Sequence, residues 1–461
     1  MTAALVLAVG LGVAAYAKLN GNISRVDVSK QVGTDRPTEK AATASTGPLN
    51  ILVLGSDNRS TLGTTRYGTE PGARSDTTLL VHLTADRKSI TVVSIPRDSM
   101  VQAPPSCSPT VPKSQWQVRQ WNLNFNDGGT GCVIRTLEGN TGVFINHYAV
   151  VNFNGFKGMV NALGGVEVCT PQPINDKDSG LTLSAGRHHI NGTQALGYVR
   201  VRETVGDGSD LGRIDRQQAF MASVAQEATQ SSLLLRPDKL FSFLSAATES
   251  LTTDPAFGIS TMKDVADSVK NVGIDRIQFV TVPTEEYPPD HNRVQWAASA
   301  DQIWEALRND HAVGAKPKAT PTPTASPVTL TVSPAAISVE VVNASGVSGI
   351  ATQAQKALQV QGFKSVTVAN GATTTGTVIE YAAGQQEAAK TVAAAFPGSV
   401  TRQVSGLGTR VRVTVGVGSA NVVEVSNRLG SAPLPTPTVT AVPSGPTVKI
   451  TTRKASDSIC S

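Results

Sequence analysis

The sequence is short of charged residues, which limits the classes of protein to which it can belong. Only 16% of its 461 residues are Asp, Glu, Lys or Arg, against about a quarter in an average soluble domain. The 40 Lys and Arg outnumber the 35 Asp and Glu, for a formal net charge of +5. So small and dispersed an excess does not predict a nucleic-acid-binding protein.

Several catalytic and metal-binding motifs are missing too. The chain has no P-loop, no Rossmann glycine pattern and no motif of a Ser–His–Asp hydrolase. Its four cysteines are Cys107, Cys132, Cys169 and Cys460. They include no C-x-x-C pair, and no histidine cluster accompanies them, so a zinc site is not expected.

The cysteines instead fit disulfide bonds in an oxidising compartment. Cys107 and Cys132 flank a polar, Pro-rich segment. A bond between them closes a loop of about 26 residues and stabilises the fold by about 3–4 kcal/mol. The remaining pair, Cys169 and Cys460, then ties the C-terminal end back to the main domain.

The N-terminus predicts a membrane anchor over residues 1–19. Residues 3–17 carry no charge, and Lys18 ends the run. This length is at the lower limit for crossing a hydrocarbon core of about 30 Å. A cleaved signal peptide is an alternative because "AYA" resembles a cleavage site; a start further upstream and a buried helix are two more. The anchor and the signal peptide both place the remaining chain on the extracytoplasmic side of the cell membrane.

The length predicts two domains with linkers. The expected order is an anchor (1–19), a polar stalk (20–48), a first domain (49–312), a Pro/Thr linker (313–335), a second domain (336–418), and a linker with a cysteine-containing tail (419–461). Strand and helix patterns alternate in the first domain, which predicts an α/β layered fold. The second domain reads strand–helix–strand–strand–helix–strand, a small α+β unit.

The elements of the first domain follow from local patterns. Apolar runs predict strands in "LNILVLGSD", "DTTLLVHL", "SITVVSIP", "HYAVVNF" and "RIQFVTVP". Helices are expected in "NGFKGMVNAL" and "NGTQALGYVR", from Leu211 onward, from Leu233 to Val269, and around Gln302–Arg308.

Charged residues stand at the ends of the predicted strands. Asp57 and Arg59 follow the first, Arg74 and Asp76 precede the second, and Arg97 and Asp98 follow the third; Arg200, Arg202, Arg213, Arg216 and Gln217 come later in one arginine-rich stretch. Open α/β sheets form their binding crevices at the strand ends. We therefore expect these side chains to converge.

Such a set suits phosphoryl transfer. The guanidinium fork of arginine binds two phosphate oxygens and stays charged at any working pH. Several arginines around a diphosphate stabilise the charge that develops on the leaving oxygen. Asp57 and Asp76 would supply the oxygen ligands that Mg²⁺ or Mn²⁺ prefers. The alternative is that each Arg–Asp pair is a salt bridge at a strand end, with Asp98 a partner of Arg97 or a turn former.

These segments resemble the LytR–CpsA–Psr family of bacterial cell-wall ligases. The matching segments, in the family's order from about residue 49 to residue 230, are "LGSDNR", "RSDTTLLVHL", "SIPRDS", "HYAVVNFNGFKGMVNALGGVEV", "GRHHINGTQALGYVRVR" and "DLGRIDRQQ". Residues 336–418 look like the accessory C-terminal domain of many actinobacterial members. The resemblance implies a three-layer α-β-α catalytic domain with a mixed sheet.

The resemblance also implies a membrane-anchored enzyme on the outer face of the membrane. Its donor would be a glycan on a polyprenyl-pyrophosphate carrier, its acceptor a peptidoglycan hydroxyl, and its cofactor Mg²⁺ or Mn²⁺ on Asp57 and Asp76. Catalysis would fall to Asp57, Asp76, Arg97, Arg200 and Arg202. Pyrophosphate binding would involve Arg59, Arg74, Arg97, Arg200, Arg202, Arg213, Arg216 and Gln217. Asp210 would help to order the arginine segment, or act only as an N-cap.

One segment departs from the family pattern. Members usually carry a lysine in a "K-x-N" segment before "GG", and here "QWNLNFNDGG" has Gln120 at that place. Arg119 is adjacent and is the expected substitute. The lipid chain would need an apolar tunnel, predicted around Val150–Leu163.

Two other functions remain open. A pyrophosphatase on the same lipid carrier would use the same residues, with water in place of the sugar hydroxyl. A non-catalytic protein that binds anionic lipids or glycans is the third option, although a pure anion binder gains nothing from two buried carboxylates.

Four smaller features have structural explanations. His188 and His189 are adjacent on a predicted strand and should point to opposite faces, which disfavours a metal pair. His147 is expected to be a hydrogen-bonded residue at a strand end. Trp116 and Trp121 could stack on sugar rings, but packing is the commoner role.

Overall fold

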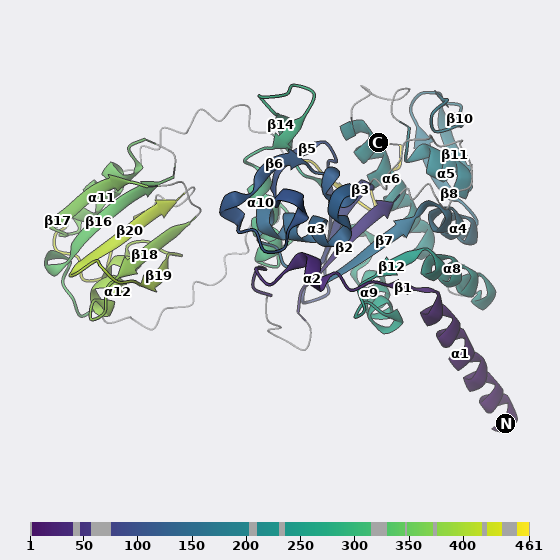
Figure 1. Ribbon diagram of the computed structural model, residues 1–461, viewed down its shortest axis with the longest axis horizontal. Coiled ribbons are helices and arrows are strands. Elements are labelled where there is room, and N and C mark those ends of the chain that lie inside the picture. Colours follow the sequence, from purple (N-terminus) through teal and green to yellow (C-terminus); the bar gives the residue numbers. More distant parts are fainter. Residues whose placement is uncertain are drawn as a thin grey trace. The chain divides into compact units, whose positions relative to one another are not determined.

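The computed structural model of the chain describes residues 2–39, 47–56, 75–201, 210–229, 236–314, 330–345, 348–371, 376–416, 422–435 and 450–460. They form two compact units (Figure 1). Unit 1 comprises Met1–Lys318 and Val448–Ser461, and unit 2 comprises Ala319–Thr447. The last residues of the chain thus belong to the first unit.

A mixed eight-stranded sheet forms the centre of unit 1, with strand order β1-β12-β7-β2-β3-β4-β13-β21. Its strands are β1 (Ser24–Arg25), β2 (Leu49–Ser56), β3 (Ser75–Leu83), β4 (Ile90–Ile95), β7 (His147–Asn152), β12 (Leu251–Thr253), β13 (Ile277–Thr281) and β21 (Thr452–Lys454). β2 and β7 are parallel, as are β4 and β13, while β3 runs antiparallel between β2 and β4.

Helices cover both faces of this sheet. They are α2 (Ser29–Val32), α3 (Leu123–Thr141), α4 (Phe153–Leu163), α5 (Gly192–Tyr198), α6 (Asp210–Thr229), α8 (Pro237–Glu249), α9 (Ile259–Val272) and α10 (Ala300–Arg308). Successive strand side chains point to opposite faces. Accordingly Leu80 packs with α3 and α10, and Leu79 packs with α6. The predicted three-layer α/β fold with a mixed sheet is confirmed.

Smaller sheets surround the main one. β5 (Ser99–Ala103), β6 (Gln117–Gln120), β14 (Thr284–Glu286) and β15 (Val294–Trp296) form a four-stranded sheet in the order β14-β15-β5-β6. Two further two-stranded antiparallel sheets pair β8 (Val166–Thr170) with β11 (Gly186–Ile190), and β9 (Ile174–Asp176) with β10 (Leu181–Leu183).

Two sequence predictions were wrong in this unit. The helical pattern expected through residue 269 is interrupted by β12, whose three residues pair with β7 and β1. So short a strand has too few residues to show an alternating pattern. The segment predicted as a stalk also contributes to unit 1: Val28 and Val32 are buried in the main core, and Arg36 forms an ion pair with Glu138 at 2.5 Å.

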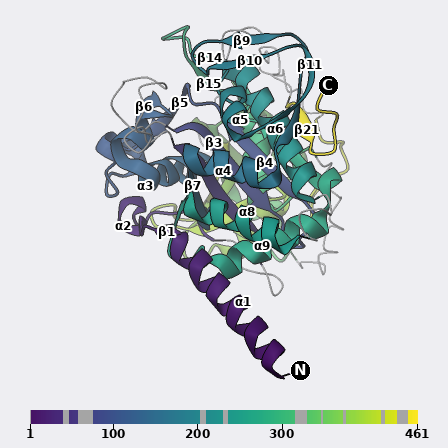
Figure 2. The same cartoon turned by 90° about the vertical axis from the view of Figure 1, so that its right-hand side faces the viewer.

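Helix α1 (Thr2–Asn22) precedes these elements and extends from the side of unit 1 that carries α8 and α9 (Figure 2). Its last residue, Asn22, donates a hydrogen bond to Thr248 of α8 at 3.2 Å. Among the described residues, no helix has both the length and the apolar character that a membrane crossing requires. The membrane anchor expected at residues 1–19 stays a prediction.

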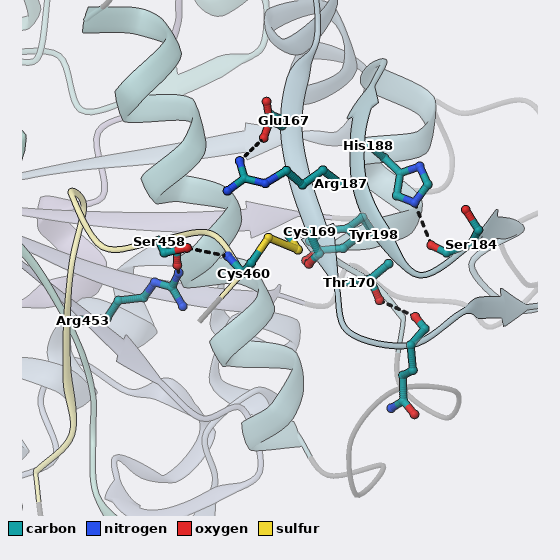
Figure 3. The surroundings of a disulfide bond; sticks show 11 residues. Glu167, Cys169, Thr170, Ser184, Arg187, His188, Tyr198, Arg453, Ser458 and Cys460 are labelled. Carbon is teal, nitrogen blue, oxygen red and sulfur yellow. Dashed lines mark hydrogen bonds and ion pairs between the residues drawn. A yellow bond between two sulfur atoms is a disulfide. The ribbon is translucent and has the colours of Figure 1, made fainter.

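Two disulfides tie distant parts of unit 1 together. Cys107–Cys132 joins residues 25 apart, and Cys169–Cys460 joins residues 291 apart. Just before Cys460, β21 adds an antiparallel strand to β13, and Ala455 is fully buried against α6. The tail therefore passes from the sheet edge to the disulfide on β8 (Figure 3).

Unit 2 has a single five-stranded sheet with helices on one face. Its elements are β16 (Ser338–Ala344), α11 (Ile350–Val360), β17 (Ser365–Asn370), β18 (Thr377–Tyr381), α12 (Gln386–Ala394), β19 (Val400–Gln403) and β20 (Arg410–Gly416), with strand order β17-β16-β20-β18-β19. The sequence predicted every element but β19. All four residues of β19 are exposed, so it has no buried face to produce a hydrophobic alternation.

Candidate functional site

The topology brings several strand ends to one edge of the main sheet. β2 is parallel to β7, and β4 is parallel to β13. Because β3 is antiparallel to both β2 and β4, the carboxyl ends of these four strands lie at the edge where β3 begins. Arg97 follows β4 by two residues and Phe153 follows β7 directly, so both lie at this edge.

The turn that carries Arg97 is fixed by its backbone. The amide of Asn122 donates to the carbonyl of Arg97 at 3.2 Å, and that of Trp121 donates to Ser99 at 2.8 Å. The guanidinium of Arg97 lies 3.5 Å from the carboxylate of Asp98, and its side chain keeps 18% of its surface exposed. Asp98 is thus a partner of Arg97, and the arginine is held where a ligand can reach it.

Helix α6 is docked on the same edge through Gln218. Its side-chain amide donates to Ser94 Oγ at 3.0 Å and to Thr281 Oγ1 at 2.9 Å, at the carboxyl ends of β4 and β13. Arg213, Arg216 and Gln217 lie within five residues of Gln218 and are all buried. The helix therefore places these donors beside the strand ends.

The segment that carries Arg200 is bonded to α6. Arg216 donates from Nη2 to the carbonyl of Val201, and Gln217 donates from Nε2 to the carbonyl of Val199 at 3.1 Å. The guanidinium of Arg200 lies over the ring of Phe153, 5.2 Å from its centre. Since Phe153 directly follows β7, Arg200 belongs to the same sheet edge as Arg97 and α6.

Tyr198 links this segment to the C-terminal disulfide. Its hydroxyl donates to the carbonyl of Cys169 at 3.1 Å (Figure 3). Burial raises the pKa of the Tyr198 hydroxyl, although Arg216 and Arg453 act in the opposite direction. The hydroxyl therefore keeps its proton at neutral pH and stays a donor.

Other predicted site residues fall outside what the structure describes. Asp57, Arg59, Arg74 and Arg202 lie outside the described residues. Asp76 is the second residue of β3 and Asp210 the first of α6, and only their backbone positions are described. Their roles stay predictions.

The metal site expected at Asp57 and Asp76 stays a prediction. Ser56, at the end of β2, pairs with Ser75, at the start of β3, beside a register shift at Gly55/Ser56. Asp57 and Asp76 are the next residues along the chain after this pair. Among the described residues, no three His, Cys, Asp or Glu side chains are grouped as a metal site would require.

Gln120, at the position of the expected lysine, lies at the site. Its side-chain amide donates to Asp98 Oδ1 at 2.5 Å. Arg119 does not substitute for the lysine: it pairs with Asp127, and its hydrogen bond holds the pKa of the Asp127 carboxyl below its ordinary value. Adjacent residues on β6 point to opposite faces, so only one of them can reach Asp98.

Sequence reasoning missed one arginine at this place. Arg293 Nη1 donates to Asp98 Oδ1 at 3.2 Å, from just before β15. No motif marks Arg293 in the sequence. Arg293 and Asp98 are 195 residues apart along the chain, and only the pairing of β15 with β5 brings them together.

The smaller features have structural roles. His188 and His189 bond two different backbone carbonyls, at Ser184 and Gly164, and do not face each other. His147 pairs with Asp254 at 3.1 Å. Trp121 is fully buried and donates to Thr78 Oγ1, so it cannot stack on a sugar. Trp116 is half-buried and lies under the guanidinium of Arg135.

Profiles of known protein families match this chain in two separate parts. The profile of the LytR_cpsA_psr family matches residues 15–310. A second profile, described as LytR cell envelope-related transcriptional attenuator, matches residues 336–419. A solved LytR-Csp2A-Psr enzyme from Actinomyces oris has a TM-score of 0.48 at 22% identity, over 62% of this chain and 95% of that one.

Two relatives illustrate the similarity to curated proteins. The probable cell wall biosynthesis protein LcpB of Corynebacterium glutamicum is 35% identical over 259 residues, which are 54% of this chain and 57% of that protein. The polyisoprenyl-teichoic acid–peptidoglycan teichoic acid transferase TagU of Bacillus cereus is 30% identical over 316 residues, or 66% of this chain and 91% of that protein. The chain thus spans well under two thirds of LcpB and most of TagU. On this evidence, the chain belongs to the LytR–CpsA–Psr family.

Proposed function

We propose that this protein is a phosphotransferase that moves a glycan from a polyprenyl-diphosphate carrier to a hydroxyl of peptidoglycan. The product is a phosphodiester between glycan and peptidoglycan, and polyprenyl phosphate is released. Family membership supports the proposal, as do the names of relatives in cell-wall biosynthesis and teichoic acid transfer.

The observation that carries the proposal is the convergence of cationic and amide donors at one sheet edge. Arg97 comes from the end of β4, Arg200 lies against the residue after β7, and α6 brings Arg213 and Arg216. Guanidinium groups from three segments can surround a diphosphate, whose oxygens need several planar donors at once.

The proposed step is a displacement at phosphorus. The acceptor hydroxyl oxygen forms a bond to the phosphorus next to the glycan, and the bond from that phosphorus to the bridging oxygen breaks. The electron pair stays on the polyprenyl phosphate, and the hydroxyl proton passes to solvent. The arginines stabilise the negative charge that builds on the bridging oxygen.

A divalent cation would share this charge. Asp57 and Asp76 are the residues that would hold Mg²⁺ or Mn²⁺, because carboxylate oxygens are the ligands these ions prefer. When bound, the ion would offset the negative charge of the diphosphate.

The proposed place of action is the outer face of the cell membrane. Two disulfides support an oxidising compartment outside the cytoplasm. A polyprenyl donor is itself a membrane lipid, so the site must work at a membrane surface. The apolar tunnel around Val150–Leu163 stays a prediction.

The test is a transfer assay with the full chain, a glycan on a short polyprenyl diphosphate, peptidoglycan fragments and Mg²⁺. We expect the wild type to form a phosphodiester-linked product, detected by mass spectrometry, and Arg97→Gln to lose it. Arg412→Gln, a substitution in unit 2, is the matched control.

The two alternatives give different products. Release of glycan phosphate without a linked product would indicate the pyrophosphatase. Binding of the lipid diphosphate with no turnover, with or without metal, would indicate a non-catalytic binding protein.

A further inference from the structure

Three side chains from three separate segments meet at the carboxylate of Asp98. Arg97 Nε lies 3.5 Å from Oδ2, and Oδ1 accepts hydrogen bonds from Gln120 at 2.5 Å and from Arg293 at 3.2 Å. The carboxylate is 25% exposed, so the group lies at the surface of the site rather than in the core.

Strand register, not a chance side-chain rotamer, brings these residues together. β5 starts at Ser99 and pairs with β15 on one side, where Ser99 faces Val294, and with β6 on the other, where Met100 faces Gln120. Arg293 precedes Val294 as Asp98 precedes Ser99. Both backbone polar groups of Arg293 are hydrogen-bonded. Its carbonyl accepts from the Tyr287 amide at 3.0 Å, and its amide donates to the Asp290 carbonyl at 2.9 Å.

The charges at Asp98 are not matched one to one. A carboxylate carries one negative charge, and Asp98 shares it between the guanidiniums of Arg97 and Arg293. Gln120 is neutral. The other carboxylate near Arg293, Asp290, is 3.8 Å away and 47% exposed, where water screens most of its attraction. Asp98 can therefore orient both arginines, and among the described carboxylates Arg293 has only this shared one and the exposed Asp290 as partners.

Arg293 is also accessible. Its side chain is 36% exposed, twice the 18% of Arg97. Because both guanidiniums contact the same carboxylate, an anion bound at Arg97 would lie close to Arg293.

We propose that Arg293 is an additional anion-binding residue, which forms with Arg97 a two-arginine clamp for the diphosphate of the donor. Asp98 sets the spacing of the two guanidiniums, and Gln120 fixes Asp98. This inference rests on the proposed function of the arginine site, because it names a further residue for the same ligand.

The test measures binding of inorganic pyrophosphate to the full chain by titration calorimetry. Arg293→Gln should weaken binding about tenfold, the size expected for the loss of one charged hydrogen-bond donor. Arg187→Gln is the matched control: Arg187 lies in a two-stranded antiparallel sheet and also pairs with a carboxylate, that of Glu167, so this variant should bind pyrophosphate as the wild type does.

A double variant separates binding from a structural role. In Arg293→Gln/Gln120→Lys, an ammonium replaces the amide that already bonds the same Asp98 oxygen. The double variant should recover most of the lost affinity. If it does not, or if Arg293→Gln binds as tightly as the wild type, Arg293 only holds the β14–β15 hairpin and the inference is wrong.

Arg97→Gln distinguishes this failure from failure of the proposed function. If Arg97→Gln weakens binding and Arg293→Gln does not, only the clamp is wrong. If neither variant changes pyrophosphate binding, the arginine site does not bind diphosphate and both proposals fail.

Discussion

Both units carry a group of arginines, and they hold these arginines in different ways. In unit 2, strand register places Glu340 opposite Arg412, Arg412 opposite Glu380, and Glu380 opposite Arg402. Arg412 lies 2.7 Å from Glu340, and Arg402 pairs with Glu380. This row, which we call the charge ladder, alternates in sign across four neighbouring strands.

The arginine site of unit 1 has a different set of partners. Arg216 and Gln217 donate to backbone carbonyls of the segment that holds Arg200, and Arg97 shares Asp98 with Arg293. A carbonyl orients a guanidinium without cancelling its charge, whereas a carboxylate does both. The ladder thus pairs its arginines with carboxylates across neighbouring strands, whereas the described contacts of the unit 1 site also bond Arg216 to a backbone carbonyl and place two arginines on one carboxylate.

The largest difference should appear in catalysis. Arg200→Gln should lower turnover of a short polyprenyl diphosphate at least about 100-fold, since removal of one preorganised donor costs this much in comparable sites. Arg412→Gln in the ladder should leave turnover unchanged. Phosphate release measures the turnover of both variants. Equal losses of turnover would contradict the distinction between the arginine site and the charge ladder.

Removing the disulfides should have the next largest effect. Loss of the Cys107–Cys132 bond, by Cys107→Ser/Cys132→Ser, should lower the free energy of unfolding by about 3 kcal/mol. Cys169→Ser/Cys460→Ser should cost more, up to about 5 kcal/mol, because that bond closes the longer loop.

Denaturant unfolding of the full chain under non-reducing conditions measures both effects. The expected order of the two losses assumes that the chain entropy of the unfolded state dominates. A larger loss of unfolding free energy in the Cys107–Cys132 variant would contradict that assumption. The Cys169–Cys460 variant should also exchange the amide hydrogens of residues 198–201 faster, since Tyr198 bonds the carbonyl of Cys169.

A smaller effect is expected within the charge ladder. Arg412→Gln removes the arginine that lies between Glu340 and Glu380. Because the pairs are partly exposed, unit 2 should lose only about 0.5–1 kcal/mol of its free energy of unfolding. Hydrogen exchange of β18 and β20 amides would report the loss. A loss of several kcal/mol would mean that the ladder, and not the apolar core, stabilises this unit.

The smallest expected effect is on the pH dependence of unfolding. It concerns a carboxylate, because carboxylates titrate and backbone carbonyls do not. Burial acts to raise the pKa of the Asp254 carboxyl, but hydrogen bonds from His147 and the Tyr148 amide outweigh it, so the pKa lies below its ordinary value. A depressed pKa stabilises the fold above about pH 4, the unfolded value. This contribution is lost as the pH falls through the folded pKa.

Asp254→Asn tests this sign. Unfolding of the variant should depend less steeply on pH below about pH 4 than unfolding of the wild type. Identical slopes would mean that the His147–Asp254 pair does not stabilise the fold.

Residues whose positions depend on local pattern could be predicted from sequence. Arg97 stands two residues after an apolar strand, and Arg213, Arg216 and Gln217 share a helix, so their general placement follows from nearby residues. Arg293 could not be predicted because it reaches Asp98 only through the pairing of β15 with β5. Arg119 was expected to substitute for the family lysine because it is adjacent to Gln120, but adjacent strand residues point to opposite faces, and Arg119 pairs with Asp127 instead.

The most direct test of the account is a crystal structure of the full chain with geranyl diphosphate. We predict that the two phosphates lie at the carboxyl edge of the main sheet, within hydrogen-bonding distance of Arg97 and Arg200. A diphosphate bound elsewhere, with these two side chains free of it, would contradict the assignment of this edge as the active site.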